Sequence, residues 1–596
     1  MPLTKLKFTP GQDTQLSQTA DEGGWFATQL IRFRDGLPQK IAGWVSYATN
    51  TVMGYPRAMH TWQQLNSVLD LAVGTHQKLQ LWQTGSFYDI TPARRVASLT
   101  NPFATTTGSK TVTVADTAHG AVIGDFVEIS GASVVGGITI SGEYTVVTIA
   151  ASAYTITSAM PAMSSATGGG TVGAVYLISP GPANTIVGTG VGVGTVGTGT
   201  VGTARTASAA YLCRTWALAN WGEYLLASPV LGPLYQWLPA GGFNTRAIVV
   251  TNATPSIGPP LQIGSMFIAM PERHCILLGC SDLNASTNYD PMIVRFSDVE
   301  DYTSYMATAT NSAGSFRLQG GTRLICGING SQTNLLFSDT SVFSMRFIGF
   351  PYVYSFDRLG TGCGIIGPHA MVEFNGVTYW MGHTGFYAFT GSAPQLIECP
   401  IWNTIFENIN DAQGDKVYCG VNSAQNEILW FYPSMSSFEN DRYVAYNYVE
   451  RTWHSGTLPR AAWVDRSTFS KPLAIDVNGN LFQQETGVDA AGIAIPSSIE
   501  SGFMDIGDGT QVMYIDRIIP DFGSNQVGNV LMTVKTSASP NSNPVTHGPY
   551  ILTPTTQFVT IRARGRQISF KFASSSIGDY WRLGVVRVQA IGDGRR

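Results

Sequence analysis

The stretch MVEFNGVTYW at 371–380, followed by GFYAF at 385–389, decides the fold class of this chain. Apolar and polar residues alternate in it, and the pair Asn375-Gly376 separates two such runs. Alternation with a period of two is typical of half-buried β-strands, and an Asn-Gly pair is a hairpin signal. The stretch therefore predicts a small antiparallel sheet built from runs of strand around tight turns.

Units of this kind recur about seven times, roughly 40–50 residues apart once one foreign segment is set aside. They begin near residues 69, 224, 275, 324, 371, 427 and 471. Sheets packed face to face around an axis bury surfaces that a single sheet would expose. We therefore expect an all-β fold with a degenerate β-propeller of about seven blades, although WD40 and kelch signatures are absent. Stacked β-sandwiches, which have no period, are the alternative.

The composition agrees with a large β protein. The chain has 596 residues, too many for one core, with 65 glycines and only 12% charged residues. Its net charge of −4 implies no global attraction to nucleic acid. The seven cysteines form no CxxC pair and predict buried, reduced thiols rather than a zinc site. No signal peptide follows Met1, and no apolar run is long enough to span a membrane.

The foreign segment covers residues 103–206 and predicts an inserted domain. It contains no tryptophan and a single leucine, Leu177, whereas the flanking sequence is rich in aromatic residues. Short alternating runs with glycine turns predict a small β-barrel or sandwich, ending in a Gly/Thr/Val-rich ribbon at 183–203. His119 and Asp125 flank a glycine turn, and we interpret them as turn caps rather than as a metal or catalytic pair.

The insertion divides the propeller into residues 25–102 and 207–490. Residues 1–24 are polar and predict an N-terminal arm, and residues 491–596 predict a C-terminal β-sandwich of the jelly-roll or immunoglobulin type. Several Trp and Arg residues in these parts are candidates for contacts with a partner; the alternatives are blade cores for Trp and solvated strand faces for Arg. The candidate interface residues are Trp25, Arg32, Arg34, Trp44, Arg564, Arg566 and Arg582.

No catalytic motif stands out. The GxSxG, HExxH and Walker patterns are absent, as are the Asp-box turns of sialidase propellers. Asp298, Glu300 and Asp301 lie close together, but acids so spaced are common in loops, although glycoside hydrolysis does use a carboxylate pair. We therefore predict no enzyme and name no catalytic, cofactor-binding or metal-binding residue.

Several stretches resemble virion proteins of short-tailed bacteriophages. These are GWFATQLIRFRDGLPQKIAGW (24–44), LLFSDTSVFSM (335–345), WMGHTGFYAFTGS (380–392), RGRQ (564–567), YWRLG (580–584) and GDGRR (592–596). The insertion, with HG at 119–120 and GDFV at 124–127, is similar to a small β module of phage structural proteins. The family closest in kind is the tail nozzle, also called the tail tube or packaged-DNA stabilisation protein.

This resemblance implies a structural subunit of the virion tail, made in the host cytoplasm. It implies a homo-oligomeric ring, a hexamer in that family, that encloses the DNA exit channel below the portal and its adaptor. The expected partners are other copies of the chain, the portal-adaptor protein, tail fibre or spike proteins, and double-stranded DNA that passes through without sequence specificity. The alternative is a receptor-binding or glycan-degrading tail protein on the same propeller; a host propeller scaffold is a third interpretation.

Overall fold

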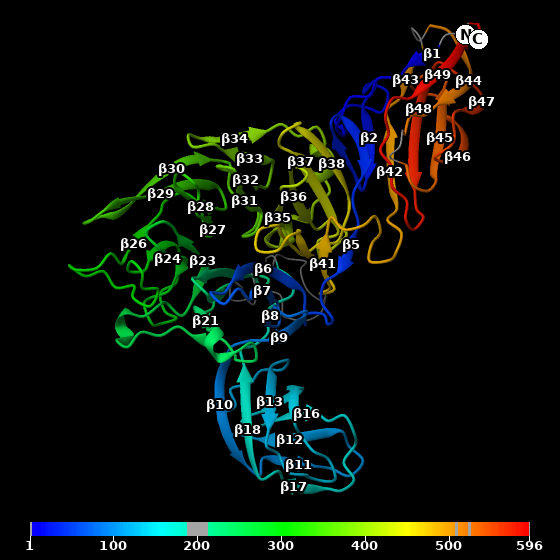
Figure 1. The fold of residues 1–596 in the computed structure, drawn as a ribbon. Coiled ribbons are helices and arrows are strands. Elements are labelled where there is room, and N and C mark those ends of the chain that lie inside the picture. The colour runs from blue at the N-terminus through cyan, green and yellow to red at the C-terminus, as the bar shows by residue number, and fades with distance from the viewer. Residues whose placement is uncertain (1–2, 187–211, 507–509, 523–525, 595–596) are drawn as a thin grey trace, which may run out of the picture.

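The computed structural model describes residues 3–186, 212–506, 510–522 and 526–594. Its strands form three bodies, namely a central propeller, an insertion below it in Figure 1, and a β-sandwich at the upper right. The predicted fold class, a seven-bladed propeller with an inserted β module and a C-terminal sandwich, is confirmed. Most of the predicted Gly/Thr/Val ribbon lies outside the described residues.

Each of the first four blades is an antiparallel meander whose strands follow one another in chain order. Blade one contains β6 (Pro56–Gln63), β7 (Leu69–Thr75), β8 (Leu79–Gln83) and β9 (Ser86–Asp89). Blade two contains β19 (Trp216–Trp221), β20 (Tyr224–Pro229), β21 (Tyr235–Trp237) and β22 (Ile248–Val249). Blade three contains β23 (Ile263–Ala269), β24 (His274–Cys280), β25 (Asp290–Phe296) and β26 (Gly314–Arg317). Blade four contains β27 (Leu324–Ile328), β28 (Asn334–Ser338), β29 (Ser341–Gly349) and β30 (Val353–Thr361).

The last three blades complete the ring. Blade five contains β31 (Met371–Phe374), β32 (Val377–Met381), β33 (Phe386–Phe389) and β34 (Pro394–Ile397). Blade six contains β35 (Tyr418–Asn422), β36 (Glu427–Tyr432), β37 (Arg442–Asn447) and β38 (Thr452–Thr457). Blade seven contains β39 (Ala462–Val464), β40 (Leu473–Ile475), β41 (Leu481–Gln484) and β5 (Trp44–Ser46). The helical segments of the described chain are α1 (Trp402–Phe406), η1 (Pro239–Gly241), η2 (Pro255–Ile257) and η3 (Asp411–Lys416).

Blade seven is closed by a strand from the other end of the sequence. The outer strand β5 pairs with β41, with Trp44 opposite Gln484 and Ser46 opposite Phe482. This closure uses a strand from the N-terminal part of the chain to complete the last blade. It thereby links the first blade to the last and keeps the ring closed.

Indole rings fix the seams between some blades. Trp216 of blade two lies against Gly74 of blade one and donates its indole N–H to the carbonyl of Thr75 at 2.7 Å. Trp463 of blade seven repeats the arrangement with Gly420 and the carbonyl of Val421 in blade six, also at 2.7 Å. Both glycines leave room for a ring that a β-carbon would strike. The buried indoles thus find a polar partner while burying a large apolar area.

The sandwich contains both ends of the chain, which differs from the predicted arm at 1–24 and from a propeller that starts at residue 25. One sheet has the order β1 (Leu3–Lys5), β49 (Arg587–Gly592), β44 (Met513–Ile519), β47 (Val559–Gly565). The other has the order β2 (Trp25–Gln29), β42 (Ser497–Ser501), β48 (Gln567–Ser574), β45 (Val530–Ser537), β46 (Val545–Leu552), with β43 (Met504–Asp505) on β48. Trp25 belongs to this core, where its ring stacks on Phe8 at 4.4 Å. Trp25, Ile31 and Phe33 are therefore buried by the sandwich and not by a blade.

Asp35-Gly36 is a hairpin turn signal in the sequence, and a hairpin is present there that leads from the sandwich to the propeller. Its strands are β3 (Ile31–Arg34) and β4 (Leu37–Lys40), joined by Asp35 and Gly36. Both turn residues have positive φ, 49° and 73°, as the turn signal in the sequence predicts.

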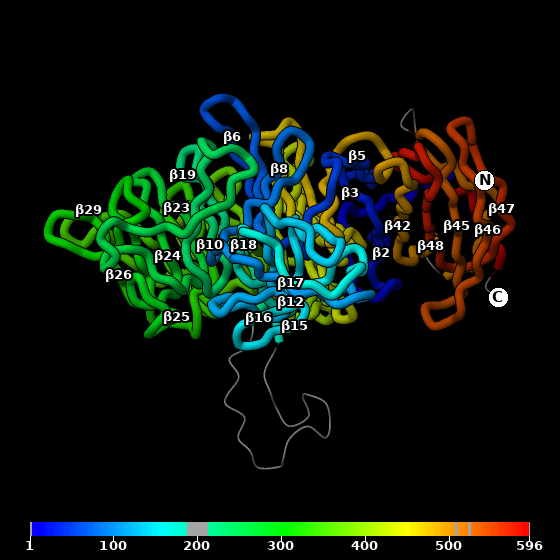
Figure 2. Tube along the Cα trace, turned by 90° about the horizontal axis from the view of Figure 1, so that it is seen from below, coloured from blue at the N-terminus to red at the C-terminus, as the bar shows by residue number. Residues whose placement is uncertain are grey.

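The insertion leaves the propeller between β9 and β19 and starts about ten residues earlier than predicted, at Ala93. One sheet has the order β10 (Ala93–Thr100), β18 (Thr171–Leu177), β13 (Phe126–Ser130), β14 (Gly142–Thr145). The other has the order β15 (Thr148–Ala150), β16 (Ala153–Thr157), β12 (Thr111–Ala115), β11 (Phe103–Thr105), β17 (Ala166–Gly168). Figure 2 views the molecule from the insertion side, with the sandwich at one end and the β29–β30 hairpin at the other.

Candidate functional site

The junction between sandwich and propeller is held by a buried ion network. Arg32 of β3 enters the space between blades six and seven, where its Nε lies 3.1 Å from a carboxylate oxygen of Glu427. Its two terminal nitrogens donate to both carboxylate oxygens of Glu485, at 2.9 and 2.7 Å. His454 lies 3.2 Å from Glu427 on the same oxygen. Arg32 is 4% exposed and Glu427 is 1% exposed, so the network is shielded from water.

Electrostatics in this network favour the charged forms. Burial raises the pKa of Glu427, but the charge of Arg32 and the hydrogen bond from His454 outweigh burial, so that the pKa lies below its usual value. The pKa of Arg32 is raised despite burial, because two carboxylates face the guanidinium. Arg32, expected on the surface, thus makes an intramolecular contact. It joins the sandwich to two blades of the propeller.

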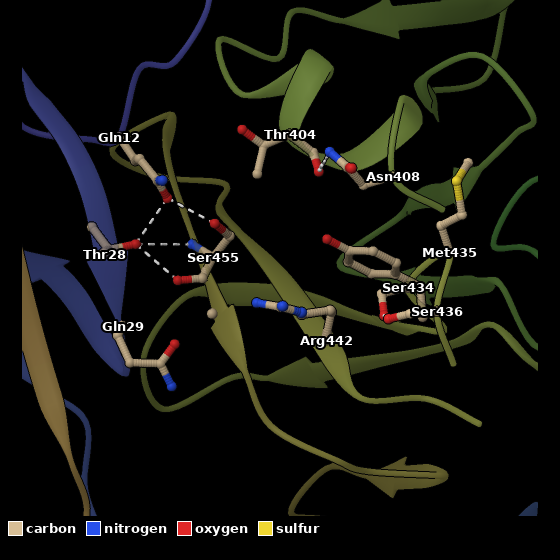
Figure 3. Close-up of a pocket in the computed structure, with 12 residues that line it drawn as sticks. Gln12, Thr28, Gln29, Thr404, Asn408, Ser434, Met435, Ser436, Arg442 and Ser455 are labelled. Atoms are coloured by element: carbon tan, nitrogen blue, oxygen red, sulfur yellow. Dashed lines mark hydrogen bonds between the residues drawn. The ribbon is translucent and has the colours of Figure 1, made fainter. Parts of the chain in front are cut away.

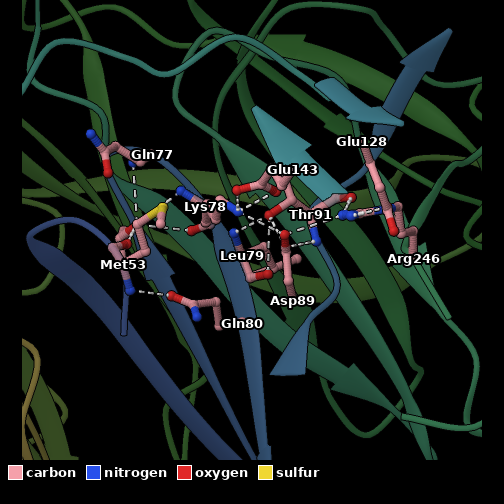
Figure 4. A network of polar contacts seen from close by, with 11 residues as sticks. Met53, Gln77, Lys78, Leu79, Gln80, Asp89, Thr91, Glu128, Glu143 and Arg246 are labelled. Atoms are coloured by element: carbon pink, nitrogen blue, oxygen red, sulfur yellow. Dashed lines mark hydrogen bonds and ion pairs between the residues drawn. The ribbon is translucent and has the colours of Figure 1, made fainter. Parts of the chain in front are cut away.

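A second ion network fixes the insertion to the propeller (Figure 4). The ammonium of Lys78, the residue before β8, lies 2.9 Å from Asp89 of the same blade and 2.6 Å from Glu143 of the insertion. Arg246, between β21 and β22, contacts Glu128 of the insertion at 2.7 Å and Asp89 at 3.3 Å. Burial raises the pKa of Asp89, but Lys78 and Arg246 outweigh it and lower the pKa overall. Blades one and two therefore both bind the insertion through ion pairs.

The remaining predicted interface residues do not form one surface. Trp44 is half-buried beneath the guanidinium of Arg460, whose central carbon lies 4.6 Å from its ring. Arg34 is exposed, and Arg582 donates to the Arg34 carbonyl at 2.7 Å and to Asp35 at 2.9 Å, so that the structure brings these two arginines together at the hairpin turn.

Two further candidates lie on the sandwich. Arg564 is exposed on β47 and pairs with Asp593, whereas Arg566 is half-buried just beyond the end of β47. Of the seven predicted interface residues, Trp25 and Arg32 are thus buried within the subunit, and the exposed ones lie at separate places.

The predicted turn acids and His119 have structural roles. Both ring nitrogens of His119 are occupied, one by the Ala150 carbonyl and the other by the Ala121 amide, each at 2.9 Å. Asp125 accepts a hydrogen bond from the Val122 amide, as expected of a turn cap. In the second acidic segment Asp298 caps a turn with the Ser312 amide at 2.8 Å. Neither segment presents an unengaged carboxylate pair of the kind that glycoside hydrolysis needs.

The described part of the chain holds no group of three or more His, Cys, Asp or Glu side chains suited to a metal. All seven cysteines are buried free thiols, and burial raises the pKa of Cys275 and of Cys399 to about 12. Such thiols are unreactive at neutral pH. No helix in the described residues is long and apolar enough to cross a membrane.

Two open grooves lie on the outside of the propeller. The first, of about 670 Å³, runs between β2 of the sandwich and blade six (Figure 3). Its lining is neutral apart from Arg442, and the hydroxyls of Thr28 and Ser455 donate to the Gln12 side-chain oxygen at 2.8 Å each. The remaining wall is made by α1 and the residues just after it, and by the end of β36 and the loop that follows, through Thr404, Asn408, Tyr432, Ser434, Met435 and Ser436.

The second groove, of about 590 Å³, lies between the outer strands of blades five and six. We name it the tyrosine groove after Tyr379, Tyr446 and Tyr448, which line it together with Glu398 and Arg451. Sequence reasoning missed both grooves. The sequence signal for the second groove was the pair Tyr446 and Tyr448, two residues apart and followed by charged residues. This signal identifies a groove only when blade five is known to form the opposite wall.

Comparison with known proteins adds little to this geometry. No known protein family and no curated protein matches the sequence. Among solved structures the chain is similar to an exo-β-1,3-galactanase from Phanerochaete chrysosporium, with 11% identity over 63% of this chain and 95% of that one and a TM-score of 0.23. It is similar to the endosialidase of phage phi92, with 13% identity over 72% of this chain and 63% of that one and a TM-score of 0.19. A third match is the extracellular domain of a putative one-component system from B. thetaiotaomicron, with 9% identity over 89% and 80% and a TM-score of 0.27.

These matches correct one prediction. The chain was predicted not to be an enzyme, and that prediction is contradicted because glycoside hydrolases recur among the similar structures. TM-scores this low transfer no active site to the chain, and its propeller is defined by its own strand pairing.

Proposed function

We propose that this protein is a structural subunit of a short bacteriophage tail, a tail nozzle that assembles with copies of itself into a ring around the DNA exit channel. The sequence resemblance to tail proteins suggests the role, and the architecture suits it. A stiff seven-bladed hub carries two β modules in fixed positions, each held by a buried ion network. A channel wall under load needs rigid connections of this kind between its parts.

The observation that carries the proposal is an exposed apolar hairpin. The tip between β29 and β30 projects from the propeller, at the far left of Figure 2, and exposes Ile348, Phe350 and Tyr352 by 53%, 67% and 78%. Grouped apolar side chains on a projecting tip are unfavourable in water unless a partner covers them, and aromatic residues are typical anchors of protein interfaces. A neighbouring copy of the subunit is the partner that a ring supplies.

Electron microscopy of the purified protein, together with its mass in solution, tests this role. We expect closed rings with a central channel, and we expect the double variant Phe350→Ser/Tyr352→Ser to remain folded and monomeric. The paired control Val122→Ser/Ile123→Ser alters exposed apolar residues of the insertion and should leave the rings intact. A wild-type protein that stays monomeric at high concentration and in the presence of its portal-adaptor would refute the proposal.

The second candidate is a tail protein that binds or degrades a host surface glycan. The two grooves favour it, because hydroxyl, amide and aromatic groups converge in spaces of about 670 and 590 Å³, one between the sandwich and blade six and the other between blades five and six. Incubation with host surface polysaccharide separates the candidates. Release of reducing ends supports a degrading enzyme, and retention of intact glycan supports a receptor-binding role. If the protein neither cleaves nor retains the glycan, this second candidate is eliminated.

A further inference from the structure

We infer that the tyrosine groove is a binding site for a short oligosaccharide. The inference rests on the second candidate function and gives it a location and a ligand chemistry. The groove is distinct from the hairpin tip and from both ion networks, so it serves no contact described above.

The walls of the groove come from two neighbouring blades. Tyr379 lies on β32 of blade five, and β34 of the same blade contributes Gln395 to the rim. Blade six supplies Tyr446 at the end of β37 and Tyr448 just beyond it. Packing of the blades fixes the two walls, so the site is formed before any ligand arrives, which lowers the entropic cost of binding.

Tyr446 and Tyr448 are held by neighbouring side chains, and the groove retains hydrogen-bonding capacity. The Tyr446 ring packs on Trp453 at 4.7 Å, and the Trp453 indole donates to the Glu398 carbonyl at 3.0 Å. The Tyr448 hydroxyl donates to Asn426 at 3.1 Å. The hydroxyls of Tyr379 and Tyr446, by contrast, bond to no group of the described chain. Two phenol groups on the wall of an open groove, without protein partners, are free to donate hydrogen bonds to a polar ligand and to accept them from it.

The charges of the groove are also unengaged. The carboxylate of Glu398 and the guanidinium of Arg451 are both exposed and make no ion pair with any residue that the structure describes. A carboxylate that accepts and a guanidinium that donates hold neighbouring hydroxyls by charge-assisted hydrogen bonds. Aromatic faces beside them suit the C–H surface of a pyranose ring.

This combination favours a sugar over the other ligands. A lipid chain would leave both charges unsolvated. A peptide added as a strand would pair with β34, whose first residue, Pro394, provides no amide donor. A volume of about 590 Å³ lies within the range of ligand sites and exceeds what one small sugar fills.

Glycan binding by the full-length protein tests the site. The probes are short oligosaccharides prepared from host surface polysaccharide, first on an array and then titrated against Trp fluorescence. We expect Arg451→Gln and Tyr379→Ala each to weaken binding about tenfold or more, because each removes hydrogen bonds or a stacking face. The matched control is Arg562→Gln, an exposed arginine on β47 of the sandwich that lines neither groove, which should leave the affinity unchanged. Circular dichroism shows whether the variants remain folded.

The other outcomes are distinct. If the oligosaccharides bind but both tyrosine-groove variants bind as tightly as the wild type, the glycan site lies elsewhere; the second candidate function stands and this inference fails. If no oligosaccharide binds, both fail. Displacement of bound oligosaccharide by an extended peptide at lower concentration would also overturn the inference, since it would identify the groove as a strand-addition site.

Discussion

Replacing Arg32 by methionine tests how the sandwich is attached to the propeller. Methionine keeps much of the side-chain volume and removes the charge. The variant leaves Glu427, which is 1% exposed, as a buried carboxylate without its cation. Glu485 is less affected, because its side chain is 15% exposed and gains water more readily.

The expected loss follows from that burial. Removing one partner of a buried ion pair costs about 3–5 kcal/mol, mostly because the other charge remains uncompensated. A second change, Glu427→Gln in the Arg32→Met background, removes that charge and should restore part of the stability. The pKa of Glu427 lies below its usual value of 4.5, so the network stabilises the fold at neutral pH. That contribution is lost as the pH falls from about 4.5 through the lowered pKa of the folded protein.

Chemical denaturation and hydrogen exchange of residues 25–40 measure the effect. The matched control is Arg34→Met, two residues further along the same strand with a side chain 59% exposed, which should change the stability by less than about 0.5 kcal/mol. Faster exchange confined to the hairpin and the adjoining strands is expected in the Arg32 variant. Equal stability and equal exchange in the two variants would show that the network does not hold the junction.

Three further predictions follow from other contacts. Lys78→Met leaves the carboxylates of Asp89 and Glu143 facing each other and should weaken the contact between the insertion and blade one by about 2–3 kcal/mol. Faster proteolysis near residues 91–93 measures this loss. The control is the exposed Lys110→Met, and equal cleavage of the two variants contradicts the prediction. Gly420→Ala places a methyl group against the Trp463 ring and should cost about 1–3 kcal/mol in thermal unfolding, whereas Gly385→Ala meets only the flexible end of Leu396 and should cost little. Burial lowers the pKa of His369 from 6.5 to about 4, so as the pH falls this histidine is protonated in the unfolded chain before it is protonated in the folded protein. Stability should therefore fall by up to about 3 kcal/mol between pH 6.5 and pH 4, and His369→Gln should flatten this dependence in pH-resolved melting curves.

The sequence predicts the repeated part of this fold well, since local alternation and turn residues determine a blade. The stretch at 371–389 forms three strands as expected, and Asp35-Gly36 forms the expected hairpin turn. The sandwich was misjudged at its N-terminal side. A three-residue strand such as β1 carries no periodic signal, and its pairing with β49 spans almost the whole chain.

The candidate sites were harder to foresee for a related reason. In the sequence Arg32 is one charged residue in an alternating strand pattern, which predicts an exposed side chain. Its partners Glu427 and Glu485 lie about 400 residues or more away, and no nearby residue identifies them. The tyrosine groove likewise depends on the packing of blade five against blade six. Contacts between blades and domains depend on how these units pack in space. A single sequence indicates mainly the strands and turns within each unit.

The strand that completes blade seven has a consequence for how the protein is made. Residues 44–46 leave the ribosome early, yet their partner, residues 481–484, is synthesised more than 400 residues later. The nascent chain must therefore keep an early segment unpaired through the synthesis of six blades and an entire inserted domain. Strand β1 pairs with β49, so the same delay applies to the sandwich, which Figure 1 shows at the upper right. Premature termination anywhere before residue 481 yields a chain whose propeller cannot close, and such products are natural substrates for cellular proteases and chaperones.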